Sequence, residues 1–185
     1  MARPSEAPSA ERVLELAWSR PATLGDGRLV CIDGRAGSGK STLARAVTAL
    51  AGDDERVVHM DDLYEGWSGL PTIDAQLDGL LRPLAAGRPG GYRRYDWERG
   101  EYAETVSVSP GSLLVLEGVG SGSRGTVDLA TVVVWIEAAY DVRMRRGIER
   151  DGEAFAPYWE QWAAAEAEHF ARHRTRERAD LVFGT

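Results

Sequence analysis

The sequence predicts an α/β domain with three layers, in which a five-stranded, mainly parallel sheet lies between helices. Short apolar runs alternate with segments of helical spacing along most of the chain, and this alternation favours strand–helix–strand units. The strand candidates are apolar at successive positions, as strands buried on both faces are. A glycine-rich turn at 34–41 joins an apolar run to a helical segment. Together these observations predict a single domain spanning 1–185.

The chain of 185 residues has a net charge of −7. Its length suits one domain with a substantial core. The acidic balance argues against a broad nucleic-acid surface, which needs a basic stripe. No apolar run is long enough for a membrane span, and the segment 1–10 has no hydrophobic core of a signal peptide. We expect a cytoplasmic protein without nucleic-acid or membrane partners and with a disordered segment 1–10.

The expected elements follow in chain order. A short helix at 11–19 precedes the first strand, and Thr72 is a candidate N-cap for a helix in which Pro83 is a candidate kink. The segment 90–110 is different, because two extended pieces suggest a hairpin beside the main sheet. The strands are expected at 29–33, 56–60, 113–116, 131–136 and 179–183, and the further helices at 40–50, 72–86, 139–150 and 158–174.

The segment 34–41 reads GRAGSGKS and matches the phosphate-binding pattern G-x-x-x-x-G-K-[ST] in full. Its glycines let the backbone wrap around an anion, and the helix that follows adds its positive end. Lys40 is expected to reach the β- and γ-phosphates, Ser41 to ligate Mg²⁺, and Thr42 to support the α-phosphate. A strand-to-helix turn without a ligand is the alternative. The remaining loop residues expected to bind ATP are Gly34, Ala36, Gly37, Ser38 and Gly39.

Two carboxylates stand where strands end. Asp61 follows the second expected strand and faces the phosphate crevice, where it can act as a general base on an acceptor hydroxyl or orient that hydroxyl. Glu117 ends the apolar run at 113–116 and is expected to hold Mg²⁺ directly or through water. A turn or helix-cap role is the alternative for both residues.

These segments together resemble the uridine kinase and phosphoribulokinase group of P-loop kinases. The resemblance is carried by IDGRAGSGKST at 32–42, MDDLY at 60–64, RYDW at 94–97 and LVLEG at 114–118. It implies that Asp61 is the catalytic base and that Tyr64 lines the acceptor site. It also aligns Tyr95 and Asp96 with a family segment, so that Asp96 would bind hydroxyl groups of the acceptor.

The resemblance extends to an arginine-rich helix that leads into a mobile lid, here near 147–157. Arg143, Arg146 and Arg150 share one helical face. Arg146 and Arg150 are assigned to the charge of the transferring phosphoryl group, whereas the place of Arg143 is left open. A solvated basic face is the alternative.

The resemblance is weaker on the acceptor side. The residues after Trp97 are Glu98, Arg99, Gly100 and Glu101, and they supply no histidine of the kind with which uridine kinases read the nucleoside. A guanine-reading Asn-Lys-x-Asp pattern is absent, which argues against a GTPase. The sequence therefore predicts a Mg²⁺- and ATP-dependent kinase for a small-molecule hydroxyl, with a nucleoside as the first candidate. A non-nucleoside alcohol (sugar, vitamin precursor or antibiotic) and an ATP-binding accessory protein are the alternatives.

Overall fold

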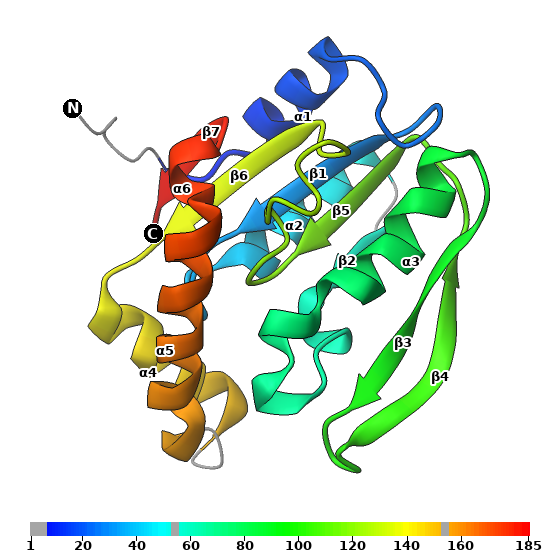
Figure 1. Ribbon diagram of the computed structural model, residues 1–185. Coiled ribbons are helices and arrows are strands. Elements are labelled where there is room, and N and C mark those ends of the chain that lie inside the picture. The colour runs from blue at the N-terminus through cyan, green and yellow to red at the C-terminus, as the bar shows by residue number, and fades with distance from the viewer. Residues whose placement is uncertain (1–6, 53–55, 153–155) are drawn as a thin grey trace.

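The computed structural model describes residues 7–52, 56–152 and 156–185, and it describes Arg150, Asp151 and Ala156 by their backbone alone. Its centre is a five-stranded sheet in the order β2-β5-β1-β6-β7, and every neighbouring pair is parallel. Figure 1 shows this sheet between layers of helices. The predicted α/β class and the parallel five-stranded sheet are confirmed. The strands are β1 (Arg28–Asp33), β2 (Val57–His59), β5 (Leu113–Glu117), β6 (Val132–Glu137) and β7 (Leu181–Gly184).

Successive side chains of the central strands enter two different cores. In β1, Leu29 and Cys31 pack with one apolar cluster, whereas Val30 and Ile32 pack with the other. Helices α1 (Ala10–Ser19) and α2 (Lys40–Ala51) cover one face, and α3 (Asp74–Ala85) and α5 (Ala156–His173) cover the other (Figure 1). Helices therefore shield both faces of the sheet from solvent, which explains why the sequences of these strands are continuous apolar runs.

Two further helices complete the described part of the chain. Helix α4 (Tyr140–Asp151) follows β6, and α6 (Thr175–Arg178) is a short turn before β7. Three 3₁₀ turns lie between β2 and α3, at Met60–Asp62, Gly66–Ser68 and Leu70–Thr72. Among the described helices, none combines the length and the apolar character needed to cross a membrane.

A two-stranded antiparallel sheet stands apart from the main one. It consists of β3 (Gly90–Asp96) and β4 (Glu101–Val108), as predicted for the segment 90–110. It packs on α3, where the side-chain amide of Gln76 donates to the Arg93 carbonyl at 3.0 Å and its oxygen accepts from the Arg93 N–H at 3.1 Å. A side chain at Gly90 would lie 1.9 Å from the Leu80 carbonyl, so this close contact requires glycine.

Three local expectations are wrong. β2 is shorter than expected, because Met60 already belongs to a 3₁₀ turn. Thr72 is not the N-cap of α3; it ends the 3₁₀ turn that runs directly into that helix through Ile73. Pro83 does not split α3, because it lies in the last turn, where the helix is about to end at Ala85. Of the segment expected to be disordered, residues 1–6 lie outside the described part, and α1 begins at Ala10.

Candidate active site

The phosphate-binding loop joins the carboxyl end of β1 to the first turn of α2. Three of its glycines, at 34, 37 and 39, have positive φ angles of 146°, 76° and 95°, which turn the backbone sharply. Gly39 is the residue before α2 and has no side chain to cap the helix. The amides of the first helical turn can therefore donate to a bound anion.

Lys40 is the only lysine in the sequence. It begins α2, its residue is 8% exposed, and its Nζ donates to the Arg35 carbonyl at 3.0 Å. The ammonium group thus lies across the phosphate-binding loop and is held by one backbone acceptor. In the same loop, the Ser38 hydroxyl is buried without a hydrogen-bond partner among the described residues. Both polar groups can bond to a phosphate that enters the loop.

Helix α4 lies directly against the loop. A side chain at Gly37 would lie 2.3 Å from the Arg143 carbonyl. Arg143 is buried, and its Nη1 donates to the Ala36 carbonyl at 3.1 Å. Arg146 donates from Nη1 to the Gly37 carbonyl at 3.4 Å and to the Thr185 hydroxyl at 2.8 Å. Two of the three arginines on this helical face therefore meet the phosphate-binding loop.

Glu117, at the end of β5, lies beside Ser41. The Ser41 hydroxyl donates to Glu117 Oε1 at 2.9 Å, and His59 Nδ1 is 2.5 Å from the same oxygen. Burial raises the pKa of Glu117, but the hydrogen bond from His59 and the charge of Lys40 outweigh it, so that the net pKa is lowered. Glu117 is therefore a buried, ionised carboxylate next to the loop serine.

This pair of oxygen donors suits a magnesium ion that is also bound by phosphates. Mg²⁺ prefers oxygen ligands and is bound through one or two carboxylates together with substrate phosphates. Within 7–52, 56–152 and 156–185, no group of three His, Cys, Asp or Glu side chains forms a metal site. That Ser41 and Glu117 hold Mg²⁺ stays a prediction, and in that case the remaining ligands would be oxygens of a nucleotide and of water.

Removing the charge of Glu117 tests this metal site. In Glu117→Gln, we expect the concentration of Mg²⁺ needed for half-maximal nucleotide binding to rise roughly 10- to 100-fold. The reason is that the amide of glutamine carries no negative charge to attract the cation beside Ser41. Glu137→Gln is the matched control, since Glu137 ends β6 but pairs with Arg176 at 2.7 Å. A magnesium titration followed by calorimetry measures both variants, and an unchanged requirement in Glu117→Gln would contradict the assignment.

Asp33 joins the phosphate-binding loop to the loop that follows β5. It ends β1, is fully buried, and accepts hydrogen bonds from the N–H groups of Gly34, Gly120 and Gly122 at 2.7, 2.9 and 3.0 Å. Burial raises the pKa of Asp33 to about 6, although the three amides favour the ionised form. One carboxylate thus fixes the start of the phosphate-binding loop against a neighbouring turn.

Asp61 lies on the same edge of the sheet. β2 pairs with β5 so that His59 stands opposite Glu117, and Asp61 follows His59 by two residues. The Asp61 residue is exposed, and its backbone carbonyl accepts from Trp97 Nε1 at 2.9 Å. The adjacent Asp62 is half-buried, and burial raises its pKa. An exposed carboxylate therefore follows the strand whose His59 contacts Glu117, and its role as a general base stays a prediction.

Comparisons with known proteins find one relative by sequence and several structures with the same fold. No protein-family profile matches the sequence. A uridine kinase from Halobacterium salinarum is 35% identical over 136 residues, which covers 65% of this chain and 60% of the relative. Over that span the chain is similar to a uridine kinase. The match spans less than two thirds of the length of that curated relative.

Two solved structures share the fold of this chain. A candidate uridine kinase from Bacillus stearothermophilus superposes with a TM-score of 0.61 at 24% identity, over 94% of this chain and 97% of that one. A candidate fructose transport system kinase from a Silicibacter species gives a TM-score of 0.65 at 22% identity, over 94% and 96%. At these identities the two structures establish the fold.

Two aromatic residues that the sequence assigned to the acceptor site lie inside the protein. Tyr64 is fully buried, and its hydroxyl donates to the Val119 carbonyl at 2.5 Å. Tyr95 is also buried and packs edge-on against Trp97 and Tyr102. Neither side chain forms an exposed wall, so their contact with an acceptor stays a prediction.

Asp96, the third residue assigned to the acceptor, caps a turn. One of its oxygens accepts from the N–H groups of Glu98 and Arg99 at 3.1 Å each, at the junction of β3 and β4. Arg99 also approaches its other oxygen at 3.8 Å. The structure thus gives Asp96 a local structural role, and its binding of acceptor hydroxyls stays a prediction.

Aromatic side chains gather beside Asp61. Trp67 stacks on Tyr158 of α5 with ring centroids 5.0 Å apart and an angle of 8°, and it lies 4.9 Å from Trp97. The exposed fractions of Trp97 and Tyr158 are 39% and 41%. These rings join the turn after β2, the hairpin and α5 into one partly exposed aromatic surface.

Part of the expected lid cannot be placed. Arg150 belongs to α4, but its side chain lies outside the described residues, as do residues 153–155 of the expected lid at 147–157. Of the predicted loop residues, Thr42 is an exposed residue in the first turn of α2. The contribution of Arg150 and of the lid stays a prediction.

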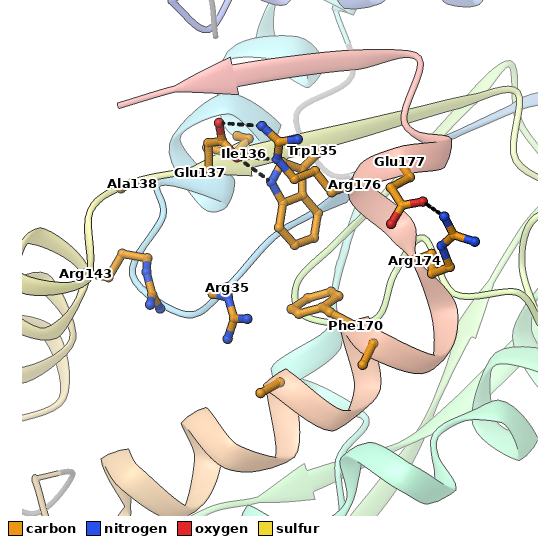
Figure 2. A pocket seen from close by; sticks show the side chains of 12 residues that line it. Arg35, Trp135, Ile136, Glu137, Ala138, Arg143, Phe170, Arg174, Arg176 and Glu177 are labelled. Atoms are coloured by element: carbon orange, nitrogen blue, oxygen red, sulfur yellow. Dashed lines mark hydrogen bonds and ion pairs between the residues drawn. The ribbon is translucent and has the colours of Figure 1, made fainter. Parts of the chain in front are cut away.

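A cavity of about 580 Å³ borders the loop on the side of α5. Figure 2 shows it between the end of β6, α5 and α6, with Arg35 and Arg143 at one side and Trp135 and Phe170 at its wall. The Trp135 and Phe170 rings meet edge-on at 4.7 Å. No motif of the sequence pointed to this cavity.

Proposed function

We propose that this protein is a Mg²⁺-dependent kinase that transfers the γ-phosphate of ATP to a hydroxyl group of a small molecule. The observation that carries the proposal is the contact between Ser41 and Glu117 at 2.9 Å, beside a complete phosphate-binding loop. A phosphate-binding loop alone would fit many nucleotide-binding proteins. The added carboxylate supplies the second protein ligand that a metal-bound triphosphate needs.

Each of the site residues has a separate role in the proposed transfer. The loop amides and Lys40 bind the phosphates. Ser41 and Glu117 would hold the metal, whose positive charge would offset the negative charge of the phosphates. Asp61 accepts the proton of the acceptor hydroxyl while the oxygen of that hydroxyl bonds to the γ-phosphorus. The bond from that phosphorus to the bridging oxygen breaks, and ADP leaves. Arg146 lies close enough to the loop to stabilise the charge of the transferring group.

A nucleoside is the first candidate for the acceptor, because the curated relative at 35% identity is named uridine kinase. A non-nucleoside alcohol is the second candidate. It is favoured by the name of the Silicibacter structure, a fructose transport system kinase, and by the sequence after Trp97, which lacks the expected nucleoside-reading histidine. Nucleic acid is not proposed as a partner, since the net charge is −7, and a cytoplasmic location is part of the proposal.

A phosphorylation panel separates these candidates. The purified protein is incubated with Mg²⁺ and ATP and with uridine, cytidine, fructose or a mixture of other alcohols, and new phosphate esters are read by mass spectrometry. We expect at least one ester to form, with uridine or cytidine as acceptor. Esters of non-nucleoside alcohols alone would favour the second candidate. ATP binding with slow hydrolysis and no ester would indicate an accessory protein.

A further inference from the structure

Helix α5 places a carboxylate against the phosphate-binding loop. Glu166 is fully buried, and its Oε1 accepts from the backbone N–H of Ala36 at 2.6 Å and from Trp162 Nε1 at 3.0 Å. Ala36 is the third residue of the phosphate-binding loop. An anionic side chain of the protein therefore already uses one amide of a loop whose function is to bind anions.

The surroundings of Glu166 are cationic and incompletely satisfied. Its Oε2 has no hydrogen-bond partner among the described residues. Arg35 and Arg143 each bring Nη1 to 3.9 Å from that oxygen, which is an ion-pair distance without a hydrogen bond. Both guanidinium groups lie at the cavity beside the loop (Figure 2). They can turn to another anion without breaking a hydrogen bond to Glu166.

The charge on Glu166 comes at an energetic cost. Burial raises the pKa of this carboxyl, and the Ala36 amide together with Lys40, Arg143 and Arg35 opposes the shift. A triphosphate in the loop would add several negative charges near a carboxylate that water does not screen. Like charges repel strongly in such a buried environment.

We propose that Glu166 competes with phosphate for the cationic loop and thereby sets a lower affinity for the nucleotide. This inference rests on the proposed function, because it requires that the loop bind a nucleoside triphosphate. When the triphosphate binds, Arg35 and Arg143 transfer from Glu166 to the incoming phosphate. The negative charge of α5 then opposes tight binding, which favours release of the nucleotide after each turnover.

The variant Glu166→Gln tests the charge while it keeps an oxygen that accepts from Ala36 and Trp162. Calorimetric titration with a non-hydrolysable ATP analogue and Mg²⁺ is expected to show about tenfold tighter binding, which corresponds to about 1.4 kcal/mol. Adenosine, which has no phosphate, should bind equally to both proteins. Glu168→Gln is the matched control, because Glu168 lies on the same helix, is exposed, and pairs with Arg172 at 3.0 Å. Its affinity for the analogue should equal that of the wild type.

Each outcome decides the proposal. Unchanged affinity in Glu166→Gln would mean that the charge of Glu166 has no effect on nucleotide binding, and it would overturn the proposal. Weaker affinity would also overturn it and would make Glu166 a residue that positions the loop. If Glu166→Gln does not fold, Glu166→Ala removes the same charge and must tighten binding in the same direction. If neither the wild type nor the variant binds the analogue, the proposed function fails as well, whereas wild-type binding without a gain overturns the inference alone.

Discussion

Lys40→Ala is expected to abolish ATP-dependent phosphorylation, with a loss of ~100-fold or more in kcat/KM. The ammonium group is the side-chain charge in the first turn of α2, and it lies across the loop through its 3.0 Å bond to the Arg35 carbonyl. Alanine keeps the helix and removes the charge that meets the β- and γ-phosphates. Steady-state assays with the best acceptor of the panel measure the loss.

A second basic residue provides the control for Lys40. Arg88 is exposed in the turn after α3, and Arg88→Ala removes one positive charge that does not belong to the phosphate-binding loop. Its kcat/KM should stay within about twofold of the wild type. Phosphorylation at the wild-type rate in Lys40→Ala would show that this loop does not bind the phosphate donor.

Asp61→Asn is expected to keep ATP binding and to lose most of the transfer. The amide has the shape of the carboxylate but cannot accept the hydroxyl proton, and a general base contributes on the order of 100- to 10,000-fold. Because Asp61 is exposed and its backbone carbonyl bonds to Trp97, the substitution should leave the fold intact. The pair of measurements is the calorimetric ATP affinity and the kcat of transfer.

Two further carboxylates complete this experiment, one as a control and one as the alternative base. Asp78→Asn changes an exposed carboxylate on α3 that pairs with Arg82 at 3.3 Å, and it should leave kcat unchanged. Asp62→Asn tests the adjacent residue, which is half-buried and has a raised pKa. Loss of transfer in Asp62→Asn with normal transfer in Asp61→Asn would move the base assignment by one position.

The fold was largely predictable because its signals are local. Each central strand is apolar at successive positions, and the alternation of Leu29 and Cys31 with Val30 and Ile32 between two cores accounts for that pattern. The phosphate-binding loop is a contiguous motif, so its place between β1 and α2 followed from the sequence. Element ends were less predictable, because the 3₁₀ turn at Met60 and the helix start after Thr72 depend on packing that no short segment encodes.

The donor side of the site was predictable in part. The contact of Ser41 with Glu117 could be expected, since Glu117 ends β5 and the loop that carries Ser41 follows the adjacent strand β1. The contribution of Glu166 could not be, because 130 positions separate it from Ala36 and it lies in an alanine-rich helical segment. His59 and Asp33 were missed for a similar reason, as their partners come from the neighbouring strand and its loop.

On the acceptor side, the directions of the side chains could not be read from the motif. Tyr64 stands in a segment that the resemblance assigned to substrate, but the structure directs its hydroxyl to the Val119 carbonyl. One carboxylate oxygen of Asp96 likewise accepts hydrogen bonds from backbone N–H groups in the turn before β4. A short pattern can place a residue on a strand end, whereas the direction of its side chain depends on the turns and helices packed around it.

The solitary lysine also makes the loop a unique proteolytic target. A lysine-specific endoprotease has one site in the chain, after Lys40, and cleavage there would leave fragments 1–40 and 41–185. Because that residue is 8% exposed at the start of α2, the protease can cut only when the loop and the helix open together. The cleavage rate, with and without nucleotide, therefore reports directly on how often the phosphate-binding loop leaves its closed form.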